Sequence, residues 1–154
     1  MRAGGFTLIE LVIVLTLIGV LSAVAAPRFI DYQSDVVLAS TRSLAGTLRS
    51  ASDMVYAKAL IEHKEHLSRS TVTVQGQTID IHYGYPTGTE AGIHRAVSID
   101  AEDWNTRASV STNAIIYWHG TFTGDAWGTQ CFIRFKESAS KGAAPVIDLI
   151  TGGC

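Results

Sequence analysis

The N-terminal part of the chain is dominated by one long apolar run. Of the 21 residues 6–26, 16 are apolar, and Pro27 ends the run. As a helix, residues 6–26 would extend about 31 Å at about 1.5 Å per residue, which matches a hydrocarbon core of about 30 Å. The run therefore predicts a transmembrane helix over residues 6–26, followed by a separate domain over residues 27–154.

A second helical pattern follows Pro27. Its apolar residues recur at spacings that place them on one face of a helix running to about residue 66; they are Val37, Leu44, Leu48, Ala51, Val55 and Ala59. Proline lacks an N–H and clashes with the preceding turn, so we expect the helix to kink at Pro27.

Beyond residue 71 the apolar pattern changes to a period of two. Residues 71–75 and 77–83, on either side of Gly76, predict a β-hairpin with Ile79, Ile81 and Tyr83 on one face, ended by residues 84–88. Three more strands are predicted at residues 113–119, 130–136 and 146–150, and a short helix near residues 92–98.

This order of elements predicts an α+β fold. A long helix comes first and the strands follow, which favours an antiparallel β-sheet packed against the C-terminal half of the helix. The hydrophobic N-terminal half of the helix has no partner in the chain, so we expect it to protrude and to pack against other subunits.

Composition shows that the excess hydrophobicity is local. Mean hydropathy is +0.21 over 154 residues, yet only 54 of the 128 residues 27–154 are apolar. With 12 basic and 14 acidic residues the net charge is −2, so there is no basic footprint for nucleic acid. Two cysteines exclude a disulfide-rich scaffold and a four-cysteine zinc site.

Glu10 distinguishes the apolar run from a secretory signal or a plain anchor. A cleavable signal fits poorly because the run is too long and has one arginine before it. A carboxylate in an apolar helix costs about 2.5–3.5 kcal/mol at the bilayer centre, so it needs a partner. Cleavage between Gly5 and Phe6 would create an α-amine, cationic at neutral pH, and the amine of a neighbouring subunit is the better-placed partner for Glu10.

These residues carry a family resemblance. Gly5-Phe6-Thr7-Leu8-Ile9-Glu10, followed by the apolar helix and Pro27, resembles the processing and methylation segment of type IV prepilins. The resemblance implies a leader peptide over residues 1–5, cleavage between Gly5 and Phe6 and N-methylation of Phe6. It also implies a role for Glu10 in subunit assembly.

The resemblance further implies the partners and the location of the protein. The partners are other pilin subunits, a prepilin peptidase with N-methyltransferase activity, an inner-membrane assembly platform, and host or environmental surfaces, including glycans. The precursor crosses the inner membrane once, with a cytoplasmic N-terminus that carries Arg2. The mature chain lies in an extracellular filament of a Gram-negative bacterium.

A narrower resemblance rests on scattered residues. Residues 26–35 (APRFIDYQSD), 76–78 (GQT) and 83–86 (YGYP) are similar to mannose-sensitive haemagglutinin pilins.

The two cysteines predict one disulfide. Cys131 lies on a predicted strand and Cys154 is the last residue, and two cysteines in an exported domain favour pairing over two free thiols. A bridge here would constrain the unfolded chain by about 3 kcal/mol. Type IV pilins commonly close a C-terminal loop in this way, so the resemblance agrees.

The remaining polar clusters favour no catalysis. His63 and His66 are spaced i, i+3, and Glu62 lies one turn before His66, so a metal site is conceivable there. No further ligand is evident downstream, and a solvated helix end is favoured over a metal site. The acidic run around Trp104, Asp100 with Glu102 and Asp103, is either a cation- or sugar-binding patch or an exposed polar loop. Tyr117 and Trp118 should face opposite sides of a strand; with His119 and Trp127 they would stack on sugars or anchor the core.

The sequence thus predicts a structural subunit of a type IV pilus that serves adhesion and, by extension, motility. We predict no catalytic residue, no metal and no cofactor. Two alternatives stay open: a type II secretion pseudopilin or minor pilin, which would share residues 5–27, and a membrane-anchored periplasmic enzyme.

Overall fold

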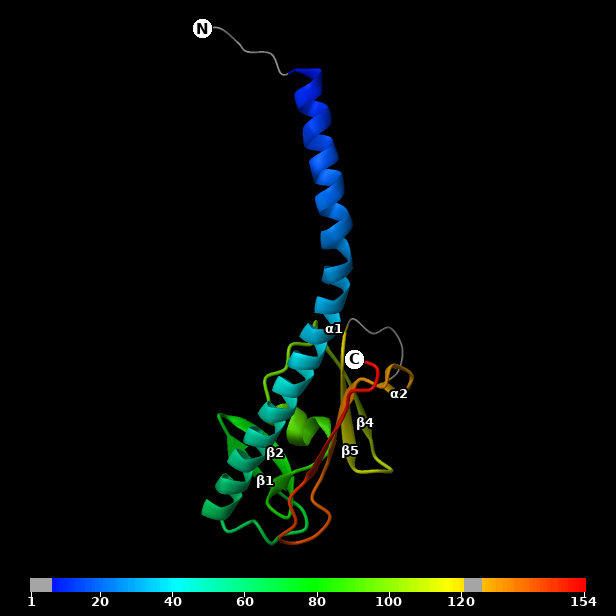
Figure 1. Ribbon diagram of the computed structural model, residues 1–154. Coiled ribbons are helices and arrows are strands. Elements are labelled where there is room, and N and C mark those ends of the chain that lie inside the picture. The colour runs from blue at the N-terminus through cyan, green and yellow to red at the C-terminus, as the bar shows by residue number, and fades with distance from the viewer. Residues whose placement is uncertain (1–6, 121–125) are drawn as a thin grey trace, which may run out of the picture. The chain divides into compact units, whose positions relative to one another are not determined.

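The computed structural model describes residues 7–120 and 126–154, apart from the side chains of residues 24–31, 33, 127 and 129. The chain divides into two compact units, Met1–Val36 and Val37–Cys154. Helix α1 (Leu8–Ile61) contributes to both units, and every other element belongs to the second (Figure 1). The helix is continuous through position 27. The kink expected at Pro27 stays a prediction.

Helix α1 ends earlier than the sequence pattern predicted. His63 has a left-handed backbone (φ 55°), the N–H of Lys64 donates to the Ala59 carbonyl (2.8 Å) and that of His63 to the Leu60 carbonyl (3.1 Å). These two bonds form a Schellman motif, which satisfies the last carbonyls and stops the helix. The prediction of a helix to about residue 66 is therefore wrong by about one turn.

The apolar stripe of α1 is confirmed as the buried face of the helix. Its fully or nearly buried members are Val37, Leu44, Leu48, Val55 and Ala59, and Ala51 is partly buried. Leu44 and Leu48 pack in one cluster with strand residues of a four-stranded sheet. Val55 and Ala59, two turns further on, pack in a second cluster with a β-hairpin.

That hairpin forms the smaller, three-stranded sheet. Strands β1 (Ser70–Val74), β2 (Gln77–His82) and β3 (Tyr85–Pro86) are antiparallel in the order β1-β2-β3. The predicted hairpin and its turn at Gly76 are confirmed, and Ile79 and Ile81 are buried against α1. Tyr83 leaves the expected strand face because it begins a second turn, and β3 was not predicted.

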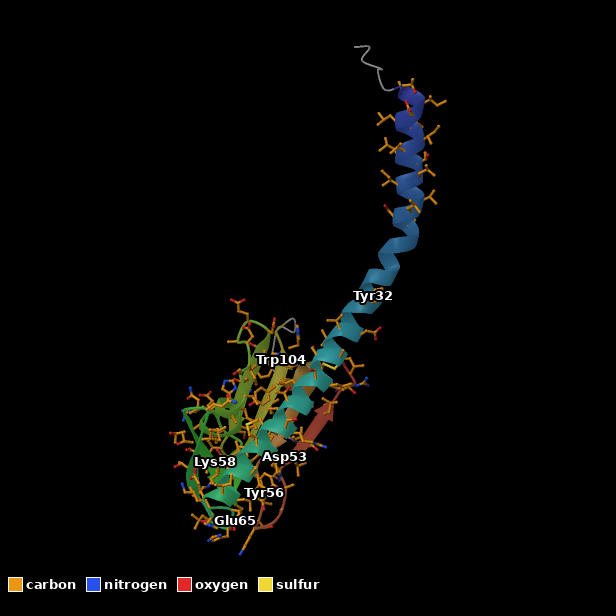
Figure 2. The ribbon with its side chains drawn as sticks, turned by 90° about the vertical axis from the view of Figure 1, so that its left-hand side faces the viewer. Tyr32, Asp53, Tyr56, Lys58, Glu65 and Trp104 are labelled. Carbon is orange, nitrogen blue, oxygen red and sulfur yellow. A yellow bond between two sulfur atoms is a disulfide. The ribbon has the colours of Figure 1, made fainter. Side chains whose placement is uncertain are left out.

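Position 84 in this second turn requires glycine. Gly84 has φ 84°, and a Cβ there would lie 2.9 Å from both Glu65 Cα and a ring carbon of Tyr56. The close approach lets Tyr85 stack on Tyr56 of α1, with ring centroids 4.2 Å apart; Figure 2 shows Tyr56 beside Asp53 on the helix. Burial raises the pKa of Tyr85, and the neighbouring Tyr56 and Asp53 add to the shift.

The larger sheet has four antiparallel strands in sequence order. They are β4 (Trp104–Ser109), β5 (Ala114–His119), β6 (Phe132–Lys136) and β7 (Val146–Ile150), with the short helical segment η1 (Glu90–His94) before them and α2 (Ala126–Thr129) between β5 and β6. Strands β5 to β7 and the short helical segment confirm the predictions. Strand β4 was missed.

Strand β5 is buried on both faces and contributes side chains to two hydrophobic clusters. On its inner face Ile115 and Tyr117 pack with Leu44 and Leu48 of α1, and with Ile93, Val97, Ile133 and Phe135. On its outer face Ile116 and Trp118 pack with Phe132 and with Ala126 of α2. Tyr117 and Trp118 therefore face opposite sides, as predicted. The α+β arrangement, a helix packed on an antiparallel sheet, is confirmed.

The predicted disulfide is present between Cys131 and Cys154, with the two Cα atoms 4.9 Å apart. Cys131 is buried directly before β6, and the N–H of Gly153 donates to the Gln130 carbonyl (3.0 Å). The last residues are therefore held beside the start of a central strand.

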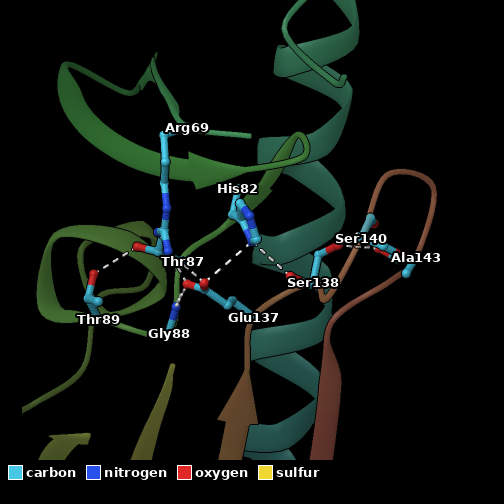
Figure 3. A network of polar contacts seen from close by, with 9 residues as sticks. All are labelled: Arg69, His82, Thr87, Gly88, Thr89, Glu137, Ser138, Ser140 and Ala143. Carbon is cyan, nitrogen blue, oxygen red and sulfur yellow. Dashed lines mark hydrogen bonds and ion pairs between the residues drawn. The ribbon is translucent and has the colours of Figure 1, made fainter. Parts of the chain in front are cut away.

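A buried carboxylate joins the two sheets (Figure 3). Glu137 follows β6 and its side chain is only 3% exposed. It accepts hydrogen bonds from Arg69 before β1 (2.9 and 3.4 Å) and from the N–H of Gly88 (3.2 Å), and His82 Nδ1 lies 3.3 Å from it. The same Nδ1 donates to the Ser138 carbonyl (2.8 Å). Groups from three separate segments thus converge on one side chain.

We predict that Glu137→Leu lowers the free energy of unfolding by about 2–3 kcal/mol, because it leaves the buried N–H of Gly88 unpaired and removes the ion pair with Arg69. Glu137→Gln should cost less, since its amide oxygen still accepts from Gly88. Exposed Glu102→Leu is the control and should stay within about 0.5 kcal/mol of wild type. Urea unfolding of the full chain in detergent, followed by tryptophan fluorescence, measures the differences. A Glu137→Leu protein as stable as the control would contradict the role of this network.

Candidate functional site

The N-terminal stretch of α1 presents apolar side chains all around its surface. Figure 2 shows side chains projecting from every side of the helix here. Their exposed fractions run from 43% at Val14 to 79% at Leu8. The large exposed residues, named the apolar helix surface below, are Leu8, Ile9, Leu11, Val12, Ile13, Val14, Leu15, Leu17, Ile18, Val20 and Leu21.

A helix that is apolar on every side is stable only when lipid or other helices surround it. The hydroxyl of Thr16 adds little polarity to this surface, because Thr16 Oγ1 donates to the Ile13 carbonyl (2.8 Å) within the helix itself. Among the described residues, no helix has both the length and the apolar character to cross a bilayer. The expected span over residues 6–26 includes residue 6 and the side chains of 24–26, which lie outside the described set.

One carboxylate, that of Glu10, lies within the apolar helix surface and bonds to Thr7. The N–H of Glu10 donates to Thr7 Oγ1 (3.4 Å), while Glu10 Oε2 accepts from the N–H (3.3 Å) and the hydroxyl (3.2 Å) of Thr7. This reciprocal arrangement is a capping box, which satisfies free N–H groups at the start of a helix. Both residues are exposed, and no cation in the described part of the chain forms an ion pair with Glu10.

Sequence analysis missed the role of Thr7. The signal was present, because a threonine followed three residues later by a glutamate before an apolar run is the sequence signature of a capping box. The two contacts of the Glu10 carboxylate, 3.3 and 3.2 Å long, come from neutral donors, and no countercharge lies beside it among the described residues. A nearby cation supplied by another chain would bind here more strongly than these neutral donors.

The other processing residues cannot be placed. The leader over residues 1–5, Gly5 of the cleavage site and Phe6 of the methylation site lie outside the described residues. Thr7, which directly follows them, is described, and helix α1 begins at Leu8. The cleavage and methylation of this segment stay predictions.

The histidines near the end of α1 are not brought together on a helix face. The helix ends before His63, and Glu62 instead pairs with Lys58 (3.1 Å) and Lys64 (2.7 Å). Hydrogen bonds from Lys64 and Lys58 lower the pKa of Glu62. His66 Nδ1 lies 3.4 Å from Glu65. Within the described ranges no three metal-ligating side chains lie together.

The acidic run before β4 forms an exposed loop. Asp100, Glu102 and Asp103 are all exposed, and Asp100 accepts the N–H of Glu102 (3.0 Å). Trp104 is half-buried and packs edge-on against His119, with ring centroids 5.5 Å apart. Its ring therefore belongs to the packing of the sheet. The side chain of Trp127 lies outside the described residues.

Comparison with known proteins places the N-terminal segment in a known class. Residues 1–26 match the family described as "Prokaryotic N-terminal methylation motif". No solved structure matches the chain.

The curated relatives carry pilus and fimbrial names. The chain is 47% identical over 64 residues to "Type IV narrow pilus major component PilA5" of Thermus thermophilus, covering 42% of this chain and 52% of that protein. It is 39% identical over 67 residues to a "Fimbrial protein" of Pseudomonas aeruginosa, covering 44% and 41%. A "Fimbrial protein" of Neisseria meningitidis is 35% identical over 86 residues, covering 56% and 48%.

The chain thus spans about half the length of the curated relatives that it matches. Within those limits, it carries a prokaryotic N-terminal methylation motif and is related in sequence to type IV pilus and fimbrial proteins.

Proposed function

We propose that the chain is a structural subunit of a type IV pilus, synthesised as a membrane-anchored precursor and polymerised into an extracellular filament. The observation that carries the proposal is the apolar helix surface with its single carboxylate, Glu10, directly after a methylation motif. Such a surface has no use in an isolated domain. It suits a helix that is held first by lipid and then by the helices of other subunits.

In this proposal, processing prepares the helix for assembly. A prepilin peptidase removes residues 1–5 after Gly5 and the new N-terminal residue, Phe6, is N-methylated. Cleavage leaves a cationic amine on Phe6, four residues before Glu10. Because Glu10 has only neutral contacts among the described residues, it is available to the methylated amine of an adjacent subunit.

The location and partners follow from the same proposal. The precursor spans the inner membrane of a Gram-negative bacterium once, with Arg2 on the cytoplasmic side. An inner-membrane assembly platform draws it into the filament, where neighbouring subunits form a helical homopolymer through different faces. The filament serves adhesion to host or environmental surfaces, with glycans among the candidate ligands, and by extension motility.

The relatives' names support a pilus subunit over a secretion pseudopilin. Within the pili, we propose the mannose-sensitive haemagglutinin class as the nearest type, on the strength of residues 26–35, 76–78 and 83–86 alone.

We predict that Glu10→Gln is processed normally yet reduces the number of surface filaments by at least about tenfold. The amide keeps the contacts to Thr7 and loses the charge, and losing one member of a desolvated charge pair costs about 2–5 kcal/mol. Thr7→Val is the matched control, because it removes the hydroxyl of the capping box and keeps the charge. Thr7→Val should assemble within about threefold of wild type.

Filament counts by electron microscopy, with each variant as the sole pilin and precursor processing followed by mass, test this pairing. Normal piliation with Glu10→Gln would contradict it. A Thr7→Val defect as large as that of Glu10→Gln would show that the capping box, and not the charge, is what assembly requires.

We also predict that Gly5→Leu accumulates as full-length precursor in the membrane and yields no filaments, because the peptidase needs a small residue before the cut. Ala3→Leu, two residues earlier in the same leader, is the control and should still be cleaved. Mass measurement of the membrane-bound chain distinguishes the two products. Cleavage of the Gly5→Leu precursor after residue 5 would contradict the proposed site.

A further inference from the structure

The outer face of the larger sheet holds a groove with basic walls. Its volume is about 600 Å³, and it lies between the end of the β4–β5 hairpin and β6. Ala114 and Ile116 of β5 form its floor, while Arg107, Arg134 and Lys136 line its sides. These five residues define the basic groove.

Strand register explains why the three cations converge. Arg107 of β4 pairs with Ile116, which pairs with Arg134 of β6, so all three lie in one row across the sheet. Lys136 pairs with Ala114 in the adjacent row. Residues paired across a sheet share a face. Ala114 has a short side chain and the basic residues have long ones, so the basic side chains form the walls of the groove above Ala114.

Among the described residues, one of the three cations of the groove has an ion-pair partner and two have none. Arg134 pairs with Asp148 of β7, at 2.6 and 3.0 Å. Arg107 and Lys136 are exposed, and neither side chain has an ion pair among the described residues. The groove therefore presents two free cations over an apolar floor, next to the hydroxyl residues Ser109 and Thr112.

The complementary charge lies in the same domain. The acidic loop, defined as residues 100–103, carries three exposed carboxylates, and none of them forms an ion pair with a described residue. Asp103 directly precedes β4 and lies four residues before Arg107, a spacing of about 13 Å in extended chain at about 3.3 Å per residue. The loop therefore lies at the start of β4 and the groove further along the strand, and no ion pair among the described residues joins the two.

We propose that the basic groove of one subunit receives the acidic loop of a second copy of this chain. The inference rests on the proposed filament, in which every subunit presents both surfaces once. A contact between two different patches is heterologous and repeats without closing, as a filament requires. The helices already hold neighbouring domains together at high effective concentration, so a modest, solvent-exposed charge contact is sufficient to fix their register.

A double charge reversal tests the pairing. Arg107→Glu with Lys136→Glu should reduce the recovery of sheared filaments at least about fivefold. Glu102→Lys with Asp103→Lys should have a similar effect. The quadruple variant has the net charge of the wild type and restores opposite charges, so its recovery should return to within about twofold. Lys141→Glu, an exposed lysine outside the groove, is the control and should assemble normally.

Each variant is expressed as the sole pilin, and its unassembled membrane pool is checked for abundance and for the intact disulfide, which separates misfolding from failed assembly. Normal recovery of the groove double variant would overturn the inference, and so would failure of the quadruple variant to recover. The latter result would assign the groove to an external polyanion instead. Absence of the wild-type chain from surface filaments would overturn the proposed function, and this inference with it.

Discussion

The architecture depends on an N-terminal helix whose large apolar side chains are exposed. Leu8 to Leu21 place large apolar side chains on every side of α1, and the second compact unit begins only at Val37. No rearrangement of side chains within so uniform a helix can hide this area from water. Such a surface suits lipid or other helices. In the proposed function, lipid surrounds the segment before assembly and the helices of other subunits surround it afterwards.

In the proposed assembly, Glu10 fixes the register between neighbouring apolar helices. Apolar side chains alone allow neighbouring helices to slide past one another, whereas a carboxylate in an apolar setting favours one register, that in which it meets a cation. The capping box with Thr7 holds the carboxylate through neutral donors, and in the proposed assembly the amine of a neighbouring subunit supplies the cation. In the second unit, the inferred contact between the basic groove and the acidic loop would likewise fix the register between neighbouring subunits. Strand β5, buried on both faces, Glu137 and the terminal disulfide hold the groove and the loop in place.

Sequence patterns predicted the parts of the fold whose signal is local. The stripe from Val37 to Ala59, the turn at Gly76 and the strands with continuous apolar runs were all recovered. Strand β4 was missed because an edge strand with Asn, Thr, Arg and Ser has no alternating apolar pattern, and it forms through its pairing with β5. The end of α1 depends on a left-handed His63, a backbone conformation that is uncommon for any residue other than glycine and has no clear signal in the sequence. The Glu137 network and the basic groove join residues far apart in sequence, so only the fold brings them together; the role of Thr7 was local and was overlooked.

The central claim is that this chain is processed and then built into a filament through its N-terminal helix. The most direct test is the mass of the N-terminal peptide of the chain recovered from sheared surface filaments. We predict a peptide that begins at Phe6 and carries one added methyl group. A filament-borne chain that still begins at Met1, or surface filaments that lack this chain altogether, would contradict it.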